Sequence, residues 1–477
     1  MGIFLRNKKI LHYLITLIIM FGFAYLPAPA PITPYGMKIA GVFLGAVYGW
    51  TVLNMLWPSL LGLIALGFHV GMTPVLQSSF GSPIIVMLLV IYVLLGLLEE
   101  CGATKVLAKA FISNRLTSGR PWIFVYLMFV GTYACAQIHP FVAILLFIGF
   151  TQQVCRIFGI SLPSKFSMLM ALGIAIASML GQITFPFLNT GLVFNASYQA
   201  MAGKALAPST YVTFMTPLHL VLMLIYTLIM KIAFRVDLSL LKNITSETFG
   251  EKQPLTEEQK VSLIGTGIFL LMALSAAFLP QTWLITQTLN RLTIFGMVGL
   301  VVIILMLAVP KTGQSLINYG LLAGKHLSWD TIFISALILA LSGYLGSPDT
   351  GIAQALSAIM QPLLSFPPIV FVVVTLLIAT IVTNFMNNIV VVVTMMPMMI
   401  NILSQIPQFS SEGIILLLFI VAQFAIATPA ASAFVGICFA TENLVEPQKM
   451  MKYSLIIVPL LFIFTLLIGI PYASLIF

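Results

Sequence analysis

The sequence predicts an all-α polytopic membrane protein with about 11 transmembrane helices and two re-entrant hairpins, arranged as inverted repeats. Hydrophobic residues make up 60% of the chain and charged residues only 7%, with a mean hydropathy of +1.12. A soluble protein of 477 residues cannot cover its surface with so few charges. Many apolar runs also reach the ~20 residues that a helix needs to cross a bilayer, whereas a β-barrel would show short alternating segments.

The first apolar run, residues 10–28, follows the basic residues Arg6, Lys8 and Lys9. This arrangement, with the segment PAPAP after it, is also typical of a signal peptide. Because the run is longer than the usual signal-peptide core and many spans follow it, we interpret it as a retained helix. It lies in an N-terminal extra segment, residues 1–35, outside the repeats.

The remaining spans follow from apolar runs between charged or turn-forming segments. In a first repeat, residues 36–235, we expect them at 37–53, 57–70, 83–98, 122–154, 166–195 and 217–232. A hydrophilic cytoplasmic linker, residues 236–260, comes next. In a second repeat, residues 261–477, we expect spans at 261–278, 295–309, 331–345, 369–402, 413–439 and 455–472.

Four of these segments are interrupted. CAQIHP divides 122–154, TNFMNN divides 369–402, ATPAAS divides 413–439, and 166–195 is broken near Gly181. Both flanks of 122–154 are basic and neither flank of 369–402 is, so a single crossing by each would contradict the charge pattern. We therefore predict that both are re-entrant hairpins.

With this topology, 18 of the 21 Lys and Arg residues fall on one side of the membrane. Only Lys38, Lys204 and Arg291 fall on the other. The positive-inside rule makes the crowded side cytoplasmic. The protein is then a multi-pass cell-membrane protein with a cytoplasmic N-terminus and an extracytoplasmic C-terminus.

The two halves align with each other at a nearly constant offset. EECGATKVLAKA, from Glu99, matches PDTGIAQALSAI, from Pro348, and CAQIHPFVAILLFIG, from Cys135, matches TNFMNNIVVVVTMMP, from Thr383. Corresponding helices run in opposite directions in the predicted topology, so the repeats are inverted. Inverted repeats with interrupted helices are typical of secondary transporters, whose sites lie where the interruptions meet.

The interruptions of the second half carry a group of polar residues: Thr383, Asn384, Asn387, Asn388 and Thr428. Their side chains offer oxygen ligands to a hard cation and N–H or O–H donors to an anion. Helix N-termini would add a positive end suited to a carboxylate. The alternative is that these residues only cap and join the hairpin helices.

The chain resembles the divalent anion/sodium symporters, a carboxylate- and sulfate-carrying family of the ion transporter superfamily. The resemblance covers nearly the whole length and includes SWDTIFISALILALSGYLGSPDTGIAQAL and the C-terminal ATPAASAFVGICFATENLVEPQKMMKYSLIIVPLL. It implies alternating access of one domain against a scaffold, a homodimer, and substrate contacts at Asn387, Asn388 and Thr428. In the first half, we expect His139 and Thr190 to contact the substrate. It also implies a cation site at Thr383, Met386, Asn388 and Ala427.

The first half departs from the family pattern. The position of its expected Ser-Asn-Thr triplet reads His139-Pro140-Phe141, and Cys135 stands where the family has a serine. His139 is either a proton-coupling or anion-binding group or a neutral histidine that packs the tip. Glu99 and Glu100 are either a solvated helix end or part of a proton relay.

The function that we expect is secondary transport of small organic anions, similar to di- or tricarboxylates, coupled to Na⁺ or H⁺, with no other cofactor. An anion exchanger, a Na⁺/H⁺ antiporter or an oxyanion permease are the alternatives. An enzyme is excluded by the lack of paired intramembrane carboxylates or a metal motif. The four separated cysteines favour neither disulfides nor metal binding, and the net charge of +9 reflects cytoplasmic loops rather than nucleic-acid binding.

Overall fold

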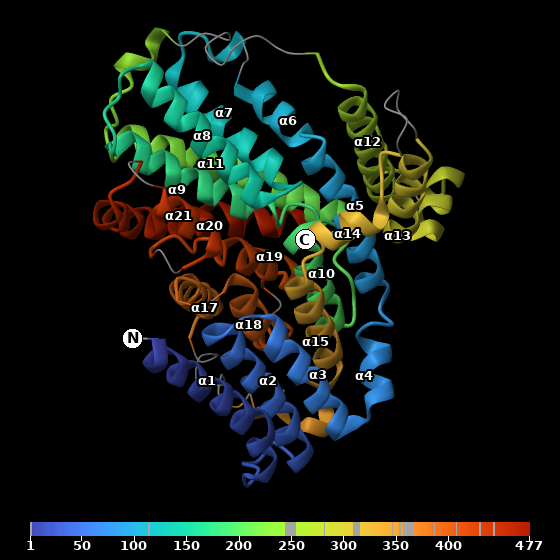
Figure 1. Cartoon of the computed structure of the whole chain (residues 1–477). Helices are drawn as coiled ribbons and strands as arrows, with labels where there is room; N and C mark the ends of the chain where they lie inside the picture. The colour runs from blue at the N-terminus through green and yellow to red at the C-terminus, as the bar shows by residue number, and fades with distance from the viewer. Residues whose placement is uncertain are drawn as a thin grey trace.

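A computed structural model shows how the chain folds (Figure 1). It describes residues 2–112, 115–243, 254–280, 282–308, 315–345, 347–352, 354–355, 358, 366–385, 387–406, 408–428, 431–441 and 444–477. Every regular element within these residues is helical, as the composition predicts. Local sequence explains many of the helix starts. For example, Thr256 and Gln259 form a reciprocal capping box, and Pro140 occupies the first turn of its helix, where no N–H is needed.

The helices pack around two hydrophobic cores. The first core takes α7 (Pro121–Ala136), α8 (Pro140–Ile157), α9 (Lys165–Gly181), α10 (Asn189–Ala202), α11 (Pro208–Ile232), α17 (Pro368–Val382), α18 (Asn388–Leu403), α19 (Ser411–Val421), α20 (Ala433–Ala440) and α21 (Pro447–Ile476). Each half of the sequence contributes one helical hairpin and one interrupted helix to it. The hairpins are α7–α8 and α17–α18, and the interrupted helices are α9–α10 and α19–α20.

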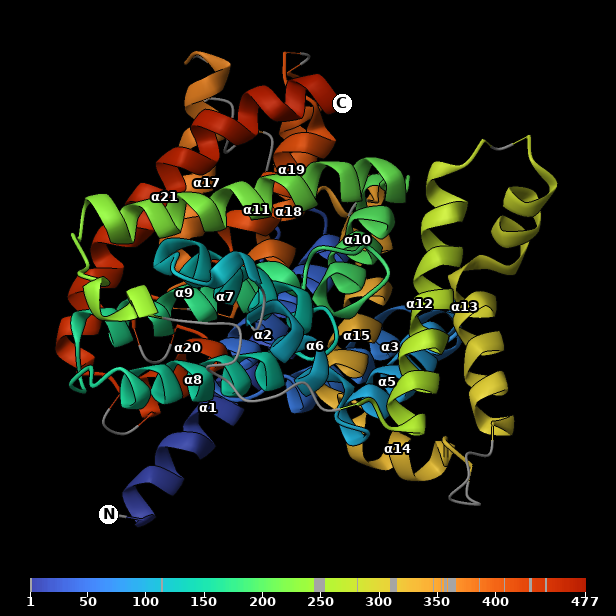
Figure 2. The ribbon, with the colours of Figure 1, turned by 90° about the horizontal axis from the view of Figure 1, so that it is seen from above.

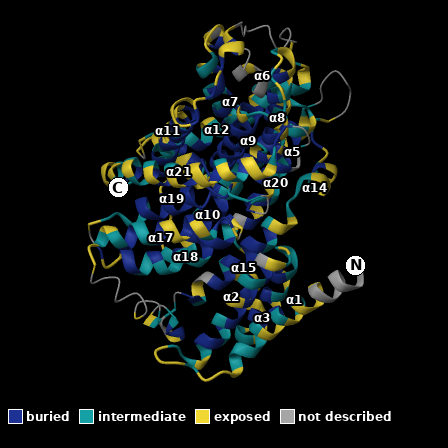
Figure 3. Cartoon of the chain, turned by 90° about the vertical axis from the view of Figure 1, so that its left-hand side faces the viewer, coloured by how far each residue is buried: buried dark blue, intermediate teal, exposed yellow. Residues whose placement is uncertain are grey.

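The second core takes α1 (Gly2–Gly22), α2 (Pro34–Val52), α3 (Leu56–Val70), α4 (Met72–Ser78), α5 (Pro83–Glu100), α6 (Ala103–Ile112), α12 (Glu257–Phe278), α13 (Leu284–Leu307), α14 (Tyr319–His326) and α15 (Trp329–Leu345). It also includes Phe187 from the break before α10, Leu192 from α10 and Val390 from α18. The two cores therefore touch along these segments. Buried residues, dark blue in Figure 3, extend through the centre of the molecule from one core to the other.

Several contacts pair helices from the two halves of the sequence. α11 and α21, the last helix of each half, pack side by side (Figure 2). α3 of the first half packs against α15 of the second, and α5 of the first half packs against α13 of the second. Both cores therefore mix helices from the two sequence halves, so neither half is a packing unit by itself.

The chain is a multi-pass membrane protein. Within the part of the chain that the structure describes, five helices are long and apolar enough to cross a bilayer, and up to six are if the bent pair α14–α15 counts as one span. α12 and α13 stand at the edge of the molecule (Figure 2). Their outer faces expose large apolar side chains, as contact with lipid requires: Ile264, Ile268, Leu271, Ile303, Ile304 and Leu307.

Some helix bounds differ from the sequence prediction. The interruption of the second half begins at Ala422, five residues before the ATPAAS segment, because the chain leaves the helix there although Gln423 is the one polar residue before Ala427. α21 begins at Pro447 rather than 455, since its first turns are polar yet helical. α13 contains a break at Thr293, whose φ of 57° is not helical. Residues 353, 356–357 and 359–365, which belong to the predicted second repeat, lie outside the described residues.

Candidate functional site

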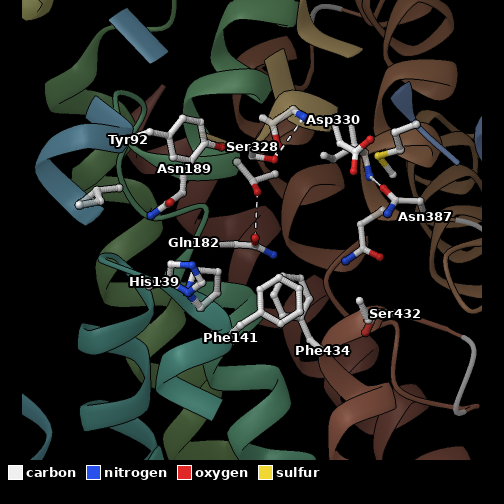
Figure 4. Close-up of a pocket in the computed structure, with 18 of the residues that line it drawn as sticks. Tyr92, His139, Phe141, Gln182, Asn189, Ser328, Asp330, Asn387, Ser432 and Phe434 are labelled. Atoms are coloured by element: carbon white, nitrogen blue, oxygen red, sulfur yellow. Dashed lines mark hydrogen bonds between the residues drawn. The ribbon is translucent and has the colours of Figure 1, made fainter. Parts of the chain in front are cut away.

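A cavity of about 590 Å³ lies between the two cores (Figure 4). Its polar lining residues come from both hairpins, both interrupted helices, the segment between α2 and α3, and the α5, α14 and α15 region. They are Asn54, Tyr92, His139, Gln182, Asn189, Thr190, His326, Ser328, Asp330, Thr331, Asn387, Asn388 and Ser432. Its apolar lining includes Trp50, Phe141, Phe385 and Phe434. The aromatic rings of Phe141 and Phe434 stack with centroids 4.5 Å apart, joining the first hairpin to α20.

Four helix N-termini of the first core meet at this cavity. The first residues of α8, α10, α18 and α20 all line it: Pro140, Asn189, Asn388 and Ala433. α8 and α18 are each the second arm of a hairpin, and α10 and α20 each follow the break of an interrupted helix. The unpaired N–H groups and the positive dipole end of each helix therefore act on the same space. No Lys or Arg occurs among the described lining residues, so the helix ends are the main fixed source of positive potential.

Three of these helices are capped by side chains that also line the cavity. His139 Nδ1 accepts from the Val142 N–H (3.3 Å), Asn387 Oδ1 from the Ile389 N–H (2.9 Å), and Ser432 Oγ from the Val435 N–H (3.2 Å). Capping uses the acceptor atom of each side chain. The Nε2–H of His139 and the Nδ2 group of Asn387 are donors that the caps do not use.

A network of neutral amides joins the two interrupted helices to the second hairpin tip. Gln423 Oε1 accepts from Gln182 Nε2 and from Asn388 Nδ2, each at 3.2 Å. Gln182 Oε1 accepts from the Thr190 hydroxyl at 2.8 Å. Gln423 is fully buried, and Gln182 and Asn388 are each 6% exposed. The network holds three segments in register at the back of the cavity.

The second tip is fastened to the neighbouring interruption. Asn384 Oδ1 accepts from the Ala427 N–H (2.7 Å), and its Nδ2 donates to the carbonyls of Thr380 (2.8 Å) and Phe424 (3.3 Å). The Thr428 hydroxyl donates to the Asn384 carbonyl at 3.4 Å. Asn384 thus works mainly as a structural link, as the capping alternative expects.

Thr383 and Asn388 form a second close group behind the cavity. The Thr383 hydroxyl donates to the Ala422 carbonyl at 2.7 Å and lies 3.3 Å from Asn388 Oδ1. Both side chains are buried. Three neutral oxygens, from a hydroxyl, an amide and a carbonyl, are therefore near one another, and such oxygens are ligands that hard cations take.

The structure brings together some of the site residues expected from the sequence and separates others. His139, Thr190, Asn387 and Asn388 line the cavity. Thr383, Ala427 and Thr428 lie behind the second tip instead, and Met386 lies outside the described residues. The cysteines are free, and the described residues contain no cluster of His, Cys, Asp or Glu suited to a metal.

Sequence reasoning missed Gln182 and Gln423. Each follows the first arm of its interrupted helix, in the segments LGQITF and VAQFAI. Aligning the interrupted helices with each other, rather than only the hairpins, would have paired them. Asp330 and His326 were missed because they belong to the other core and no local motif marks them.

Comparison with known proteins bears on the whole chain. The model of the citrate transporter family, CitMHS, matches residues 44–422. No curated protein matches the sequence. Two solved transporters share the fold. The Alcanivorax borkumensis YdaH transporter, described as having an unusual topology, has a TM-score of 0.51 at 14% identity, over 86% of this chain and 88% of its own. Neisseria gonorrhoeae MtrF, described as illuminating a class of antimetabolite efflux pumps, has a TM-score of 0.55 at 12% identity, over 98% of this chain and 93% of its own.

Proposed function

The chain belongs to the citrate transporter family, and we propose that it is a secondary active transporter of small organic anions of the di- or tricarboxylate kind. The observation that carries the proposal is the convergence of four helix N-termini on one cavity between two cores. Helix N-termini bind anions through free N–H groups and their dipole. An anion can therefore be held without a Lys or Arg that would bind it too tightly to release.

The cavity suits a flexible molecule with several polar groups. Its volume of about 590 Å³ lies within the range of small-ligand sites. Donors from His139, Asn387 and Asn189 surround the space, while Phe141 and Phe434 supply an apolar wall. Carboxylates would accept from the donors and helix ends, and the carbon skeleton would lie against the aromatic rings.

Alternating access would use the boundary between the cores. The hairpin arms α7, α17 and α18 have 16, 15 and 16 residues, or roughly 22–24 Å each, which is shorter than the hydrocarbon layer. The fourth arm, α8, has 18 residues and is long enough to cross, but its partner arm α7 is not. We therefore infer that the hairpins are re-entrant and that the first core moves against the second, carrying the cavity between the membrane faces. The N-terminus is on the cytoplasmic side and the C-terminus outside.

The coupling ion is Na⁺ or H⁺. For Na⁺, the neutral oxygens of Thr383, Asn388 and the Ala422 carbonyl provide donors of the right kind beside the cavity. For H⁺, the imidazole of His139 is the candidate, since it lies at the first tip and contacts Glu99. A cation bound at either place would offset the charge of an arriving anion.

Uptake into proteoliposomes tests the proposal. Radiolabelled citrate and succinate would be supplied with an inward Na⁺ gradient, an inward H⁺ gradient, internal anion alone, or none. The Asn388→Ala variant should lose most of the uptake, because it removes a lining amide and part of the network. Asn401→Ala, on the same helix but away from the cavity, should not. Uptake that needs only internal anion would indicate an exchanger, and no uptake under any condition would refute the carboxylate assignment.

A further inference from the structure

Two histidines from different cores meet one carboxylate at the cavity. His139 Nε2 lies 3.5 Å from Glu99 Oε2, and His326 Nδ1 lies 3.4 Å from the same oxygen. Both imidazoles line the cavity, while Glu99, near the end of α5, reaches both rings with one oxygen and is not itself among the described lining residues. The two distances exceed the ~2.7–2.9 Å of a strong charge-assisted hydrogen bond, so neither imidazole holds this carboxylate tightly.

The two rings keep their positions without Glu99. The Val142 N–H donates to His139 Nδ1, which fixes the ring as the helix cap and leaves its hydrogen on Nε2, toward Glu99. His326 Nε2 lies 3.2 Å from Glu100 Oε1, which Lys325 also contacts at 3.1 Å.

The His326 ring also packs directly on the backbone of Gly96. A Cβ at that position would come within 2.6 Å of the ring. Each imidazole is therefore preorganised by contacts that do not involve the Glu99 carboxylate.

We propose that His139 and His326 form a carboxylate subsite and that Glu99 takes the place of the substrate's carboxylate in this structure. The inference rests on the proposed function, because it assigns one end of the same anion. An arriving carboxylate and Glu99 cannot both lie between the imidazoles, since like charges within a few ångströms repel each other strongly. The substrate therefore displaces Glu99.

Displacement also changes the contact between the cores. His139 belongs to the first hairpin, whereas Glu99 and His326 belong to helices of the second core. The charged groups that face this point are Glu99, Glu100, Lys325 and the two histidines. When the substrate replaces Glu99, the direct His139–Glu99 contact between the cores is lost, and the first core is freed to move with its cargo.

The test compares isosteric variants. Glu99→Gln removes the competing charge and should lower the Kd for citrate about tenfold, measured with radiolabelled citrate on purified protein. Glu446→Gln is the matched control, because Glu446 pairs with Lys449 at the start of α21 and does not line the cavity, and it should change the Kd less than twofold. His326→Asn should raise the Kd about tenfold, and acetate should compete for binding in wild type more weakly than in Glu99→Gln.

Three results separate the inferences. A lower Kd in Glu99→Gln alone, with an unchanged melting temperature, supports the subsite. An unchanged or raised Kd in Glu99→Gln, in a variant that elutes as folded protein, overturns the subsite while leaving the transporter proposal standing. Wild-type protein that binds none of citrate, succinate and acetate overturns both.

Discussion

Replacing Gln423 with leucine should destabilise the protein more than any exposed Gln→Leu change. The variant removes the acceptor that Gln182 Nε2 and Asn388 Nδ2 share, each at 3.2 Å, in a fully buried position. It also removes the bond from Gln423 Nε2 to the Phe419 carbonyl. Leucine fills a similar volume, so the main effect is the loss of partners for buried polar groups.

The size of the effect follows from two limits. An unsatisfied buried donor costs about 1–3 kcal/mol, whereas hydrogen bonds between membrane helices average only about 0.6 kcal/mol because the unfolded state also finds partners. Two donors and one carbonyl in a packed core therefore predict a loss of about 2–4 kcal/mol in the free energy of unfolding. The melting temperature should fall by several degrees.

A thiol-reactive dye can measure this unfolding in detergent. Cys135, Cys155 and Cys438 are buried and free, so they react only when the core opens. Gln405→Leu, at an exposed glutamine just after α18, is the control and should melt like wild type.

The double variant Gln182→Leu/Gln423→Leu should recover part of the loss, since it removes one orphaned donor together with its acceptor. A Gln423→Leu variant as stable as wild type, or strictly additive behaviour in the double variant, would refute the idea that the amides form one network.

Three further predictions concern the cavity and its surroundings. Gly96→Ala should displace the His326 ring and weaken citrate binding severalfold in the same radioligand assay, and unchanged binding would show that the ring position does not matter. Asp330→Asn should strengthen anion binding severalfold, because it removes a negative charge from the N-terminal turn of α15 in the cavity; weaker binding would instead assign Asp330 to holding a cation. Glu412 pairs with Lys204, and although burial alone would raise its pKa, the hydrogen bond from Lys204 leaves the pKa of Glu412 below its ordinary value. Glu412→Gln should therefore lower stability by about 0.3–1 kcal/mol near neutral pH. This difference should shrink as the pH falls below the ordinary glutamate pKa and vanish once the pH is below the lowered pKa of folded Glu412; a difference that persists there would point to packing rather than charge.

The helical class and the membrane setting could be predicted because they depend on local composition. Apolar runs long enough to cross a bilayer can be recognised directly in the sequence, and so can polar segments such as TNFMNN that interrupt them. The family match over residues 44–422 and the two structural relatives agree with the resemblance drawn from these motifs. Helix bounds were harder to predict where a mostly apolar segment is not helical, as from Ala422 to Ile426, because hydropathy alone does not report backbone conformation.

The sequence by itself determined the apolar helices, the polar segments that interrupt the two hairpins, and the candidate site residues His139, Asn387 and Asn388. Only the tertiary structure decided which of them share a site. Gln182 meets Gln423 across 241 residues, and His139 meets Glu99 and His326 from the other core. An amide or imidazole can bond with many partners, so its chemistry does not select one. The selection comes from the packing of two cores that each combine helices from both halves of the chain, and this packing is also what brings four helix N-termini to one cavity.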